Sequence, residues 1–86
     1  MQEIINEKVS VIMTYNQSNG LVKPEKIKWQ GRIHTIETIG YHHKFHEGKK
    51  LIHIFSVADR CLAFRLRFDS DTLHWTLEEI SDGTAN

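Results

Sequence analysis

The chain has 86 residues, which is the size of one small domain. Its 11 lysines and arginines balance 11 aspartates and glutamates, so the formal net charge is zero. This balance does not point to a protein that coats nucleic acid. Apolar runs stay far below the ~20 residues of a membrane-spanning helix, and the first residues lack the pattern of a secretory signal. We expect one cytoplasmic domain over residues 1–80 without a membrane partner, and a frayed tail at residues 81–86.

Turn-forming residues recur at short intervals, and β-branched and aromatic residues alternate with polar ones between them. This pattern is typical of an antiparallel β meander. It predicts six strands, at about residues 8–15, 25–29, 32–46, 50–57, 61–68 and 73–80. In the long third segment, Ile33, Ile36 and Ile39 cannot all face the core without a bulge near residues 35–38. The sequence therefore predicts an all-β fold, either a strongly curved antiparallel sheet or a small SH3-like barrel.

Apolar faces set two of the hairpin registers, because a slip of one residue turns every side chain over. A four-residue loop after Phe68 pairs this residue with Leu73 and gives matched apolar faces on the last two strands. A turn at residues 47–48 pairs His43 with Ile52.

The connection at residues 58–60 is ambiguous, because loops of three and two residues give opposite faces. The longer loop aligns Ile54 with Phe64 and turns His53 outward. The shorter loop aligns Phe55 with Phe64 and turns His53 toward the core. The longer loop is preferred because it also places three residues of the third strand on the core side, namely Ile39, Tyr41 and Phe45.

This choice gathers cationic residues on the outer face of the sheet. The set is His42, Lys44, His53, Arg65, Arg67 and His74. Like charges that face one another on a sheet are unfavourable, so we expect an anionic partner, either nucleic acid or an acidic protein. The alternative is a solvated face whose charges are met by carboxylates at the rim, such as Glu78.

The same face carries apolar residues beside the charges. They are Phe55, Val57, Cys61 and Ala63. An exposed apolar patch usually marks an interface, so a homodimer or another protein interaction is the second hypothesis. The alternative is that Ile4 and Ile5 of the N-terminal segment cover the patch.

Nothing in the sequence supports catalysis or a bound metal. Only His42 and His53 are well placed as a pair, whereas a catalytic zinc needs three protein ligands. Cys61 has apolar neighbours, which raise a thiol pKa, and it is interpreted as structural. We expect no cofactor, no metal and no enzymatic activity.

A second basic group surrounds Trp29 and consists of Lys23, Lys26, Lys28 and Arg32. Basic residues interleaved with an aromatic ring can grip a nucleic-acid backbone and stack a base. The alternative is a half-buried strand in which Ile27 and Trp29 face the core while the lysines face water.

From the turn Trp29-Gln30-Gly31-Arg32 to the strand Leu73-His74-Trp75-Thr76-Leu77-Glu78, the sequence resembles a small uncharacterised all-β family with a Trp-x-Gly-Arg turn. The resemblance covers residues 22–80. Domains of that family are accessories of DNA-repair proteins, including relatives of Y-family polymerases, so the resemblance implies an accessory role near nucleic acid. It brings no catalytic residues. The chain departs from the pattern at His34, where an aromatic residue is usual, and in its histidine-rich segment 41–50.

Overall fold

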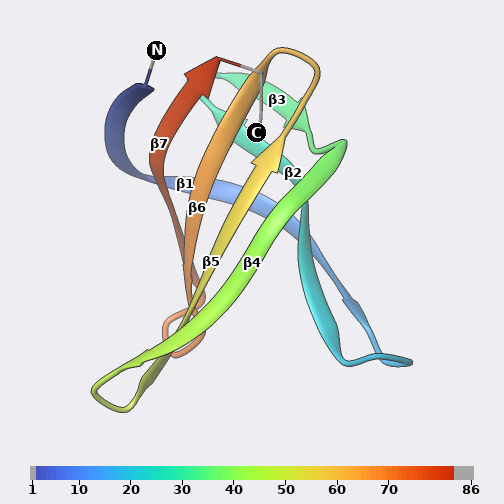
Figure 1. Ribbon diagram of the computed structural model, residues 1–86, viewed down its shortest axis with the longest axis vertical. Coiled ribbons are helices and arrows are strands. Elements are labelled where there is room, and N and C mark those ends of the chain that lie inside the picture. Colours follow the sequence, from blue (N-terminus) through green and yellow to red (C-terminus); the bar gives the residue numbers. More distant parts are fainter. Residues whose placement is uncertain (1, 83–86) are drawn as a thin grey trace.

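The structure is a computed structural model that describes residues 2–82, and these residues form an all-β fold (Figure 1). Its strands are β1 (Gln2–Asn16), β2 (Leu21–Trp29), β3 (Arg32–Thr35), β4 (Thr38–Glu47), β5 (Lys50–Ala58), β6 (Leu62–Asp69) and β7 (His74–Asp82). The predicted fold class is confirmed, with seven strands instead of six. The chain leaves the sheet at Ile36 and Glu37, which divides the predicted strand 32–46 into β3 and β4. Residues 81 and 82 belong to β7, and residues 83–86 of the predicted tail lie outside the described part.

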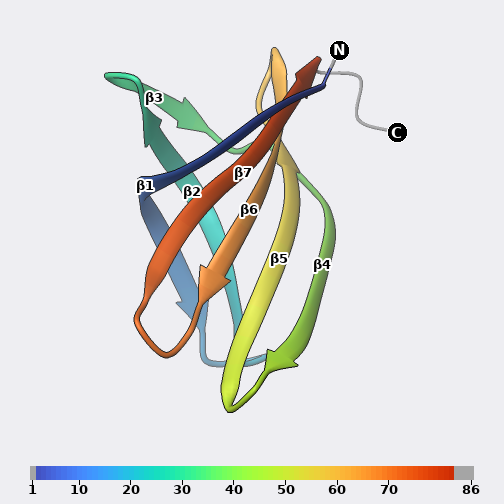
Figure 2. The same cartoon turned by 90° about the vertical axis from the view of Figure 1, so that its left-hand side faces the viewer.

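All seven strands belong to one antiparallel sheet with the order β3-β2-β1-β7-β6-β5-β4. The two edge strands, β3 and β4, follow each other in the chain and lie at opposite ends of this order. The sheet curls so that its two edges turn toward each other (Figure 2). They do not meet, because no described Cα atom of β4 lies within 8 Å of a Cα atom of β1, β2 or β3. The fold is a curved, half-open sheet rather than a closed barrel.

The concave side of the sheet holds the hydrophobic core. Its buried residues are Ile27, Phe55, Val57, Phe64, Leu66, Phe68, Trp75 and Leu77. The aromatic rings are in contact, since the centroid of Trp75 lies 4.5 Å from that of Phe68 and 5.5 Å from that of Phe55. On the last two strands, the predicted inward positions are confirmed for Phe64, Leu66, Phe68, Trp75 and Leu77. Burial of this apolar surface is the main stabilising contribution to such a fold.

The β6–β7 hairpin has the predicted faces but a different register. Phe68 pairs with Trp75, two residues beyond the predicted partner Leu73. Leu73 lies in the turn with a φ of 65° and is 67% exposed. Because the shift is an even number of residues, it leaves Leu66, Phe68, Trp75 and Leu77 on their expected face. Beyond them, a β-bulge between Arg65 and Leu66 pairs Phe64 with Ile80 and turns Ile80 toward the core. The β4–β5 hairpin is shifted by two residues as well, and His43 pairs with Ile54.

The preferred register between β5 and β6 is wrong. Phe55 pairs with Leu66 and Val57 with Phe64, so the inward face of β5 is the one that the shorter loop predicted. The cause is Asp59, whose Oδ1 accepts hydrogen bonds from the backbone N–H groups of Cys61 and Leu62, both at 2.7 Å. This local capping shapes the turn after Ala58 and sets the pairing that follows it.

As a result, β5 is buried on both faces. On the convex side, Ile52 and Ile54 are 0% and 3% exposed, and they pair with Phe45 and His43 of β4. Phe45 therefore faces outward with Tyr41, which corrects their predicted place in the core. A β-bulge between Ile39 and Tyr41 changes the pairing along β4. Ile39 pairs with Val57 and lies on the concave side.

Candidate functional site

The space between the two sheet edges, which we call the seam, is closed at one end. The backbone N–H of Ile36 donates to the carbonyl of Glu25 in β2, and that of Glu37 donates to the carbonyl of Ala58 in β5, both at 2.9 Å. His34 Nδ1 lies 2.9 Å from Asp59 Oδ2. These links join the β3–β4 connection to both sides of the seam, and we call this region the closed end.

Asp59 is the central group of the closed end. Its burial acts to raise its pKa, but the backbone N–H groups of Leu62 and Cys61, followed by His34, hold the pKa of this carboxyl below its usual value. The side chains of His34 and Asp59 are each 13% exposed. The His34 ring also packs edge-on against Phe64, with centroids 5.2 Å apart. The closed end is a compact structural joint.

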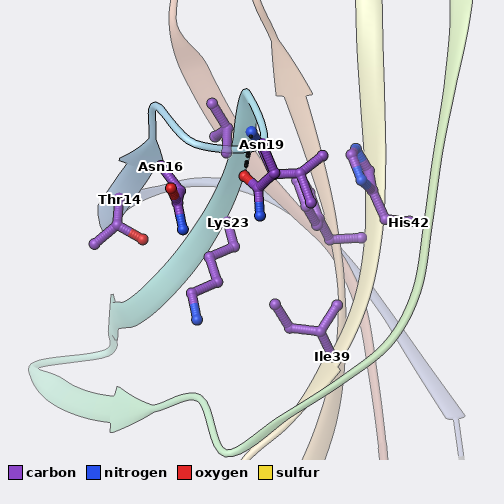
Figure 3. A pocket seen from close by; sticks show the side chains of 9 residues that line it. Thr14, Asn16, Asn19, Lys23, Ile39 and His42 are labelled. Atoms are coloured by element: carbon purple, nitrogen blue, oxygen red, sulfur yellow. Dashed lines mark hydrogen bonds between the residues drawn. The ribbon is translucent and has the colours of Figure 1, made fainter.

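The opposite end of the seam is open. The β1–β2 and β4–β5 hairpins diverge there, so their tips lie far apart (Figure 1). Between them is a groove of about 350 Å³ that β1, β2, β4 and β5 line together (Figure 3). Its walls are Leu21, Val22, Ile39 and Phe55 with the polar residues Thr14, Asn16, Asn19, Lys23 and His42. No carboxylate lines this groove within residues 2–82. We call this region the open end.

A pair of histidines lies at the open end. His42 Nε2 and His53 Nδ1 are 2.9 Å apart, and the two rings are stacked with an angle of 13° between their planes. His42 also stacks on the core residue Phe55, with centroids 4.1 Å apart. One ring nitrogen donates and the other accepts, so at least one imidazole of the pair is neutral.

The surroundings of this pair favour its neutral form. Burial lowers the pKa of His42, and Lys44 and His43 lower it further. Burial also lowers the pKa of His53, followed by the charges of His42 and Lys44. Lys44 pairs with His53 across β4 and β5 and shares the concave face. An anion placed beside this pair would oppose these effects and favour protonation.

The six residues of the predicted cationic face do not share one surface. His42, Lys44 and His53 lie on the concave side, whereas Arg65, Arg67 and His74 lie on the convex side. The reason is the β5–β6 register, which places His53 inward with Phe55. The expectation of one continuous cationic face is therefore wrong.

Carboxylates already partner the two arginines of the convex side. Arg65 Nε donates to Glu78 at 3.0 Å. Arg67 donates to both carboxylate oxygens of Glu47 at 3.2 and 3.1 Å, and its guanidinium lies 5.9 Å from the centroid of the Phe45 ring. The arginines thus follow the alternative reading in which nearby carboxylates meet the charges.

The predicted apolar patch does not form. Phe55 and Val57 are 1% and 3% exposed and belong to the core. Cys61 is exposed in the turn after β5, and Ala63 is half-buried. The same register accounts for both corrections, since it turns Phe55 and Val57 inward.

Two further features of the sequence concern metal binding and the basic group around Trp29. Within residues 2–82, no group of three or more histidine, cysteine or acidic side chains is arranged to hold a metal ion. Around Trp29, the alternative reading holds, because Ile27 is buried and Trp29 packs against the core while Lys26 and Lys28 are exposed. The indole Nε1 of Trp29 is buried without a hydrogen-bond partner in the described chain.

Sequence reasoning missed the His34–Asp59 joint and the contribution of Lys23 to the groove. The signal for the joint was present, because an aspartate at the start of a turn commonly accepts hydrogen bonds from the N–H groups that follow it. No comparable signal exists for Lys23, which reaches the groove only because the sheet curls.

The chain matches no protein-family model, no curated protein and no solved structure. In the described part of the chain, no helix is suited to crossing a membrane. The resemblance to the family with the Trp-x-Gly-Arg turn stays a prediction.

Proposed function

We propose that this chain is a non-enzymatic binding module that holds an anionic partner at the open end of the seam, through His42, Lys44 and His53. One observation carries the proposal: the groove joins apolar walls to Lys23 and to His42, and no carboxylate lines it within the described residues. His42 leads from the groove to His53, which its ring contacts, and to Lys44, which pairs with His53. A concave site with apolar walls and a few polar groups is the usual form of a ligand site.

Lys44 is the strongest candidate for contact with the partner. Lys23 also borders the groove, but its Nζ lies 3.3 Å from Glu25, which offsets part of its charge. Within residues 2–82, Lys44 forms no salt bridge, and it lies beside His53 on the concave face. An anion there would meet one permanent charge and two imidazoles that become protonated more readily once it is bound.

The histidine pair makes binding dependent on pH. The groups that act on the pair are Lys44 and, for His42, also His43, both on β4, while the uncharged rings of Phe55 and Phe68 lie beside it. Lys23 lines the same groove on β2. Because burial and Lys44 lower the pKa of both histidines, a bound anion raises that pKa and binding takes up protons. Affinity should rise as pH falls from about 8 to 6 and should fall with added salt.

A titration followed by NMR of the ¹⁵N-labelled chain tests the proposal with 2-naphthoate and its uncharged analogue 2-naphthamide. We expect naphthoate to shift amide signals around the groove and to bind several-fold more tightly than the amide. Lys44→Gln should remove this preference. Lys28→Gln, which makes the same charge change at an exposed position of β2 facing away from the core, should keep it.

Equal affinity for acid and amide in the wild-type chain would contradict the proposal, as would an equal loss in both lysine variants. An oligonucleotide titration is run beside it. If the oligonucleotide binds through Arg65, Arg67 and Lys28 while naphthoate does not bind, the convex face is the binding surface and the proposal is wrong.

A further inference from the structure

Among residues 2–82, no strand pairs with the outer edge of β4, which is unpaired along its whole length. All of its strand pairing is with β5, from Thr38 opposite Ala58 to Glu47 opposite Lys50. The strand is ten residues long and contains no proline. Alternate N–H and C=O groups on its far side are therefore available to another strand, and such an edge is a ready template for pairing.

The seam leaves open space at its open end, where the groove separates β2 from β4. Paired strands lie about 4.8 Å apart, so two strands that flank a third lie about 9.6 Å apart. Every Cα atom of β4 is more than 8 Å from the Cα atoms of β2. The facing part of β2 also lacks a partner on this side, because β3 pairs only from Lys26 to Trp29. The backbone links at Ile36 and Glu37 close the other end.

The basic side chains along β4 indicate which kind of partner this edge would bind. Residues 38–46 contain three histidines and one lysine, and no aspartate or glutamate. They are His42, His43, Lys44 and His46. The first carboxylate of the strand is Glu47 at its end, and it already binds Arg67. A partner with carboxylates would complement this edge.

The groove adds a position for an apolar side chain. Ile39 and Phe55 line it from one side, and Leu21 and Val22 line it from the other. In a strand, residues i−2, i and i+2 point to the same face. A large apolar residue that enters the groove would thus be flanked on the same face by two residues directed toward Lys44 and the histidine pair or toward Lys23.

We propose that the partner is an acidic, extended peptide segment that adds to the free edge of β4 as a further strand. This inference rests on the proposed function and names its partner. The segment would carry a large apolar residue at position i and carboxylates at i−2 and i+2. Backbone hydrogen bonds to β4 would provide affinity, and the alternating side chains would provide specificity.

A second copy of the chain is a poorer occupant of this edge. Antiparallel pairing of β4 with itself, centred on Lys44, would place the two lysines opposite each other and His42 opposite His46. Like charges that face each other across a sheet are destabilising. The net charge of the edge therefore favours an acidic segment from another protein.

The test uses a fluorescently labelled peptide with one phenylalanine between glutamates at i−2 and i+2, and the full chain. Binding is measured by anisotropy. Two further peptides carry N-methyl groups on alternate residues, one in each phase. A strand that pairs with β4 alone uses only one phase of N–H groups, so one methylated peptide should bind about tenfold more weakly and the other should bind nearly as well. Loss in both phases would mean that β2 pairs as well.

Charge is tested with matched variants. Lys44→Glu should weaken the unmodified peptide by about tenfold, and Lys28→Glu should leave its affinity unchanged. Amide hydrogen exchange should show new protection at alternate residues of β4. If both methylated peptides bind like the parent and β4 gains no protection, the strand proposal is wrong, although groove binding of naphthoate would still support the proposed function.

Other outcomes overturn both proposals or name another occupant. If neither the peptide nor naphthoate binds, the anionic partner itself is excluded. If light scattering shows a dimer that the peptide does not dissociate, β4 belongs to a self-association interface. If an oligonucleotide displaces the peptide and binds more tightly, the edge is a nucleic-acid contact.

Discussion

Both ends of the seam place a histidine ring against a phenylalanine of the core, but they give the ring opposite partners. At the closed end, His34 packs on Phe64 and contacts the carboxylate of Asp59. At the open end, His42 packs on Phe55 and contacts a second imidazole, His53. His34 thus contacts a carboxylate of the chain, whereas His42 contacts none within residues 2–82.

This difference separates the two regions by role. The carboxylate of Asp59 joins β3 to the β5–β6 turn and satisfies three donors, so its end of the seam needs no ligand. The His42–His53 pair lies beside Lys44 with its charge suppressed, and an anion from outside would stabilise the protonated form. The same residue type thus serves as a structural joint at one end and as an available contact at the other.

The largest expected effect comes from removing the phenylalanine beneath either ring. Phe55→Ala and Phe64→Ala should each lower the free energy of unfolding by about 3–5 kcal/mol, because each leaves a large cavity in the core. Tyr41→Ala, at a side chain that is 53% exposed, should cost less than about 1 kcal/mol. Urea unfolding followed by circular dichroism measures all three. A small effect at Phe55 would contradict its inward register.

The next largest effect on stability is expected from a substitution that disrupts the closed end alone. Asp59→Ala should lower the free energy of unfolding by about 2–3 kcal/mol, because three donors lose their acceptor. Asp59→Asn should recover part of this loss, since its carbonyl oxygen can still accept from Cys61 and Leu62. Asp71→Ala, at an exposed position of the β6–β7 turn, is the control. A loss of equal size at Asp71 would show that Asp59 is not a special joint.

Acidification should reduce what each end of the seam contributes to the stability of the fold, and it should do so in different pH ranges. The pKa of His42 and His53 is lowered from 6.5 by burial first, with Lys44 adding to the shift. The unfolded chain therefore binds more protons as pH falls below 6.5, and stability falls there. Despite the opposing effect of burial, hydrogen bonds lower the pKa of Asp59 from 3.8, so its contribution persists until the pH falls below 3.8.

Urea midpoints measured between pH 8 and pH 3 check this order. His42→Gln should remove much of the loss between pH 6.5 and 5 and leave the acid loss in place. Asp69 has a pKa lowered from 3.8 by the N–H groups of Asp71 and Thr72 against the effect of burial, and it adds to that acid loss. If His42→Gln and the wild-type chain lose stability in parallel above pH 5, the histidine pair is not the titrating group.

The smallest expected effect on stability concerns an ion pair on the convex side, at the tip of the β4–β5 hairpin. Arg67 binds Glu47 there, but Glu47 is 60% exposed at its side chain. A double-mutant cycle with Arg67→Ala and Glu47→Ala should give a coupling of about 0.5 kcal/mol that shrinks in 1 M salt. The pair would then be a surface contact, unlike the Asp59 joint. A coupling above about 2 kcal/mol would mean that the two charges hold the hairpin in place.

The sequence predicted the fold class because alternation between turns is a local property. The inward faces of β6 and β7 were also predictable, since Phe64, Leu66 and Phe68 alternate with the polar residues Arg65 and Arg67. The break in the segment 32–46 was foreseen as an irregularity from the parity of its isoleucines. Its form, a departure from the sheet at residues 36–37, depends on hydrogen bonds to Glu25 and Ala58, which are remote in the chain.

The candidate site was not predictable to the same degree, because β5 is apolar on both faces. Ile52 and Ile54 compete with Phe55 and Val57 for the inward side, and hydrophobic pattern alone cannot choose between them. The turn at Asp59 decides the choice, and through it the placement of His42 and His53. The closeness of these two histidines across the hairpin was recognised from the sequence, although His42 pairs with Phe55 and not directly with His53. The groove beside them forms only when distant hairpins diverge.

The positions of the two tryptophans give each end of the seam its own optical signal. The Trp29 ring lies 6.3 Å from His34. Trp75 stacks within the aromatic group that Phe55 connects to His42. Because indole emission responds to nearby charge and solvent, Trp75→Phe leaves a chain whose fluorescence reports the closed end. Trp29→Phe leaves one that reports the open end, so the two regions can be followed separately without an added dye.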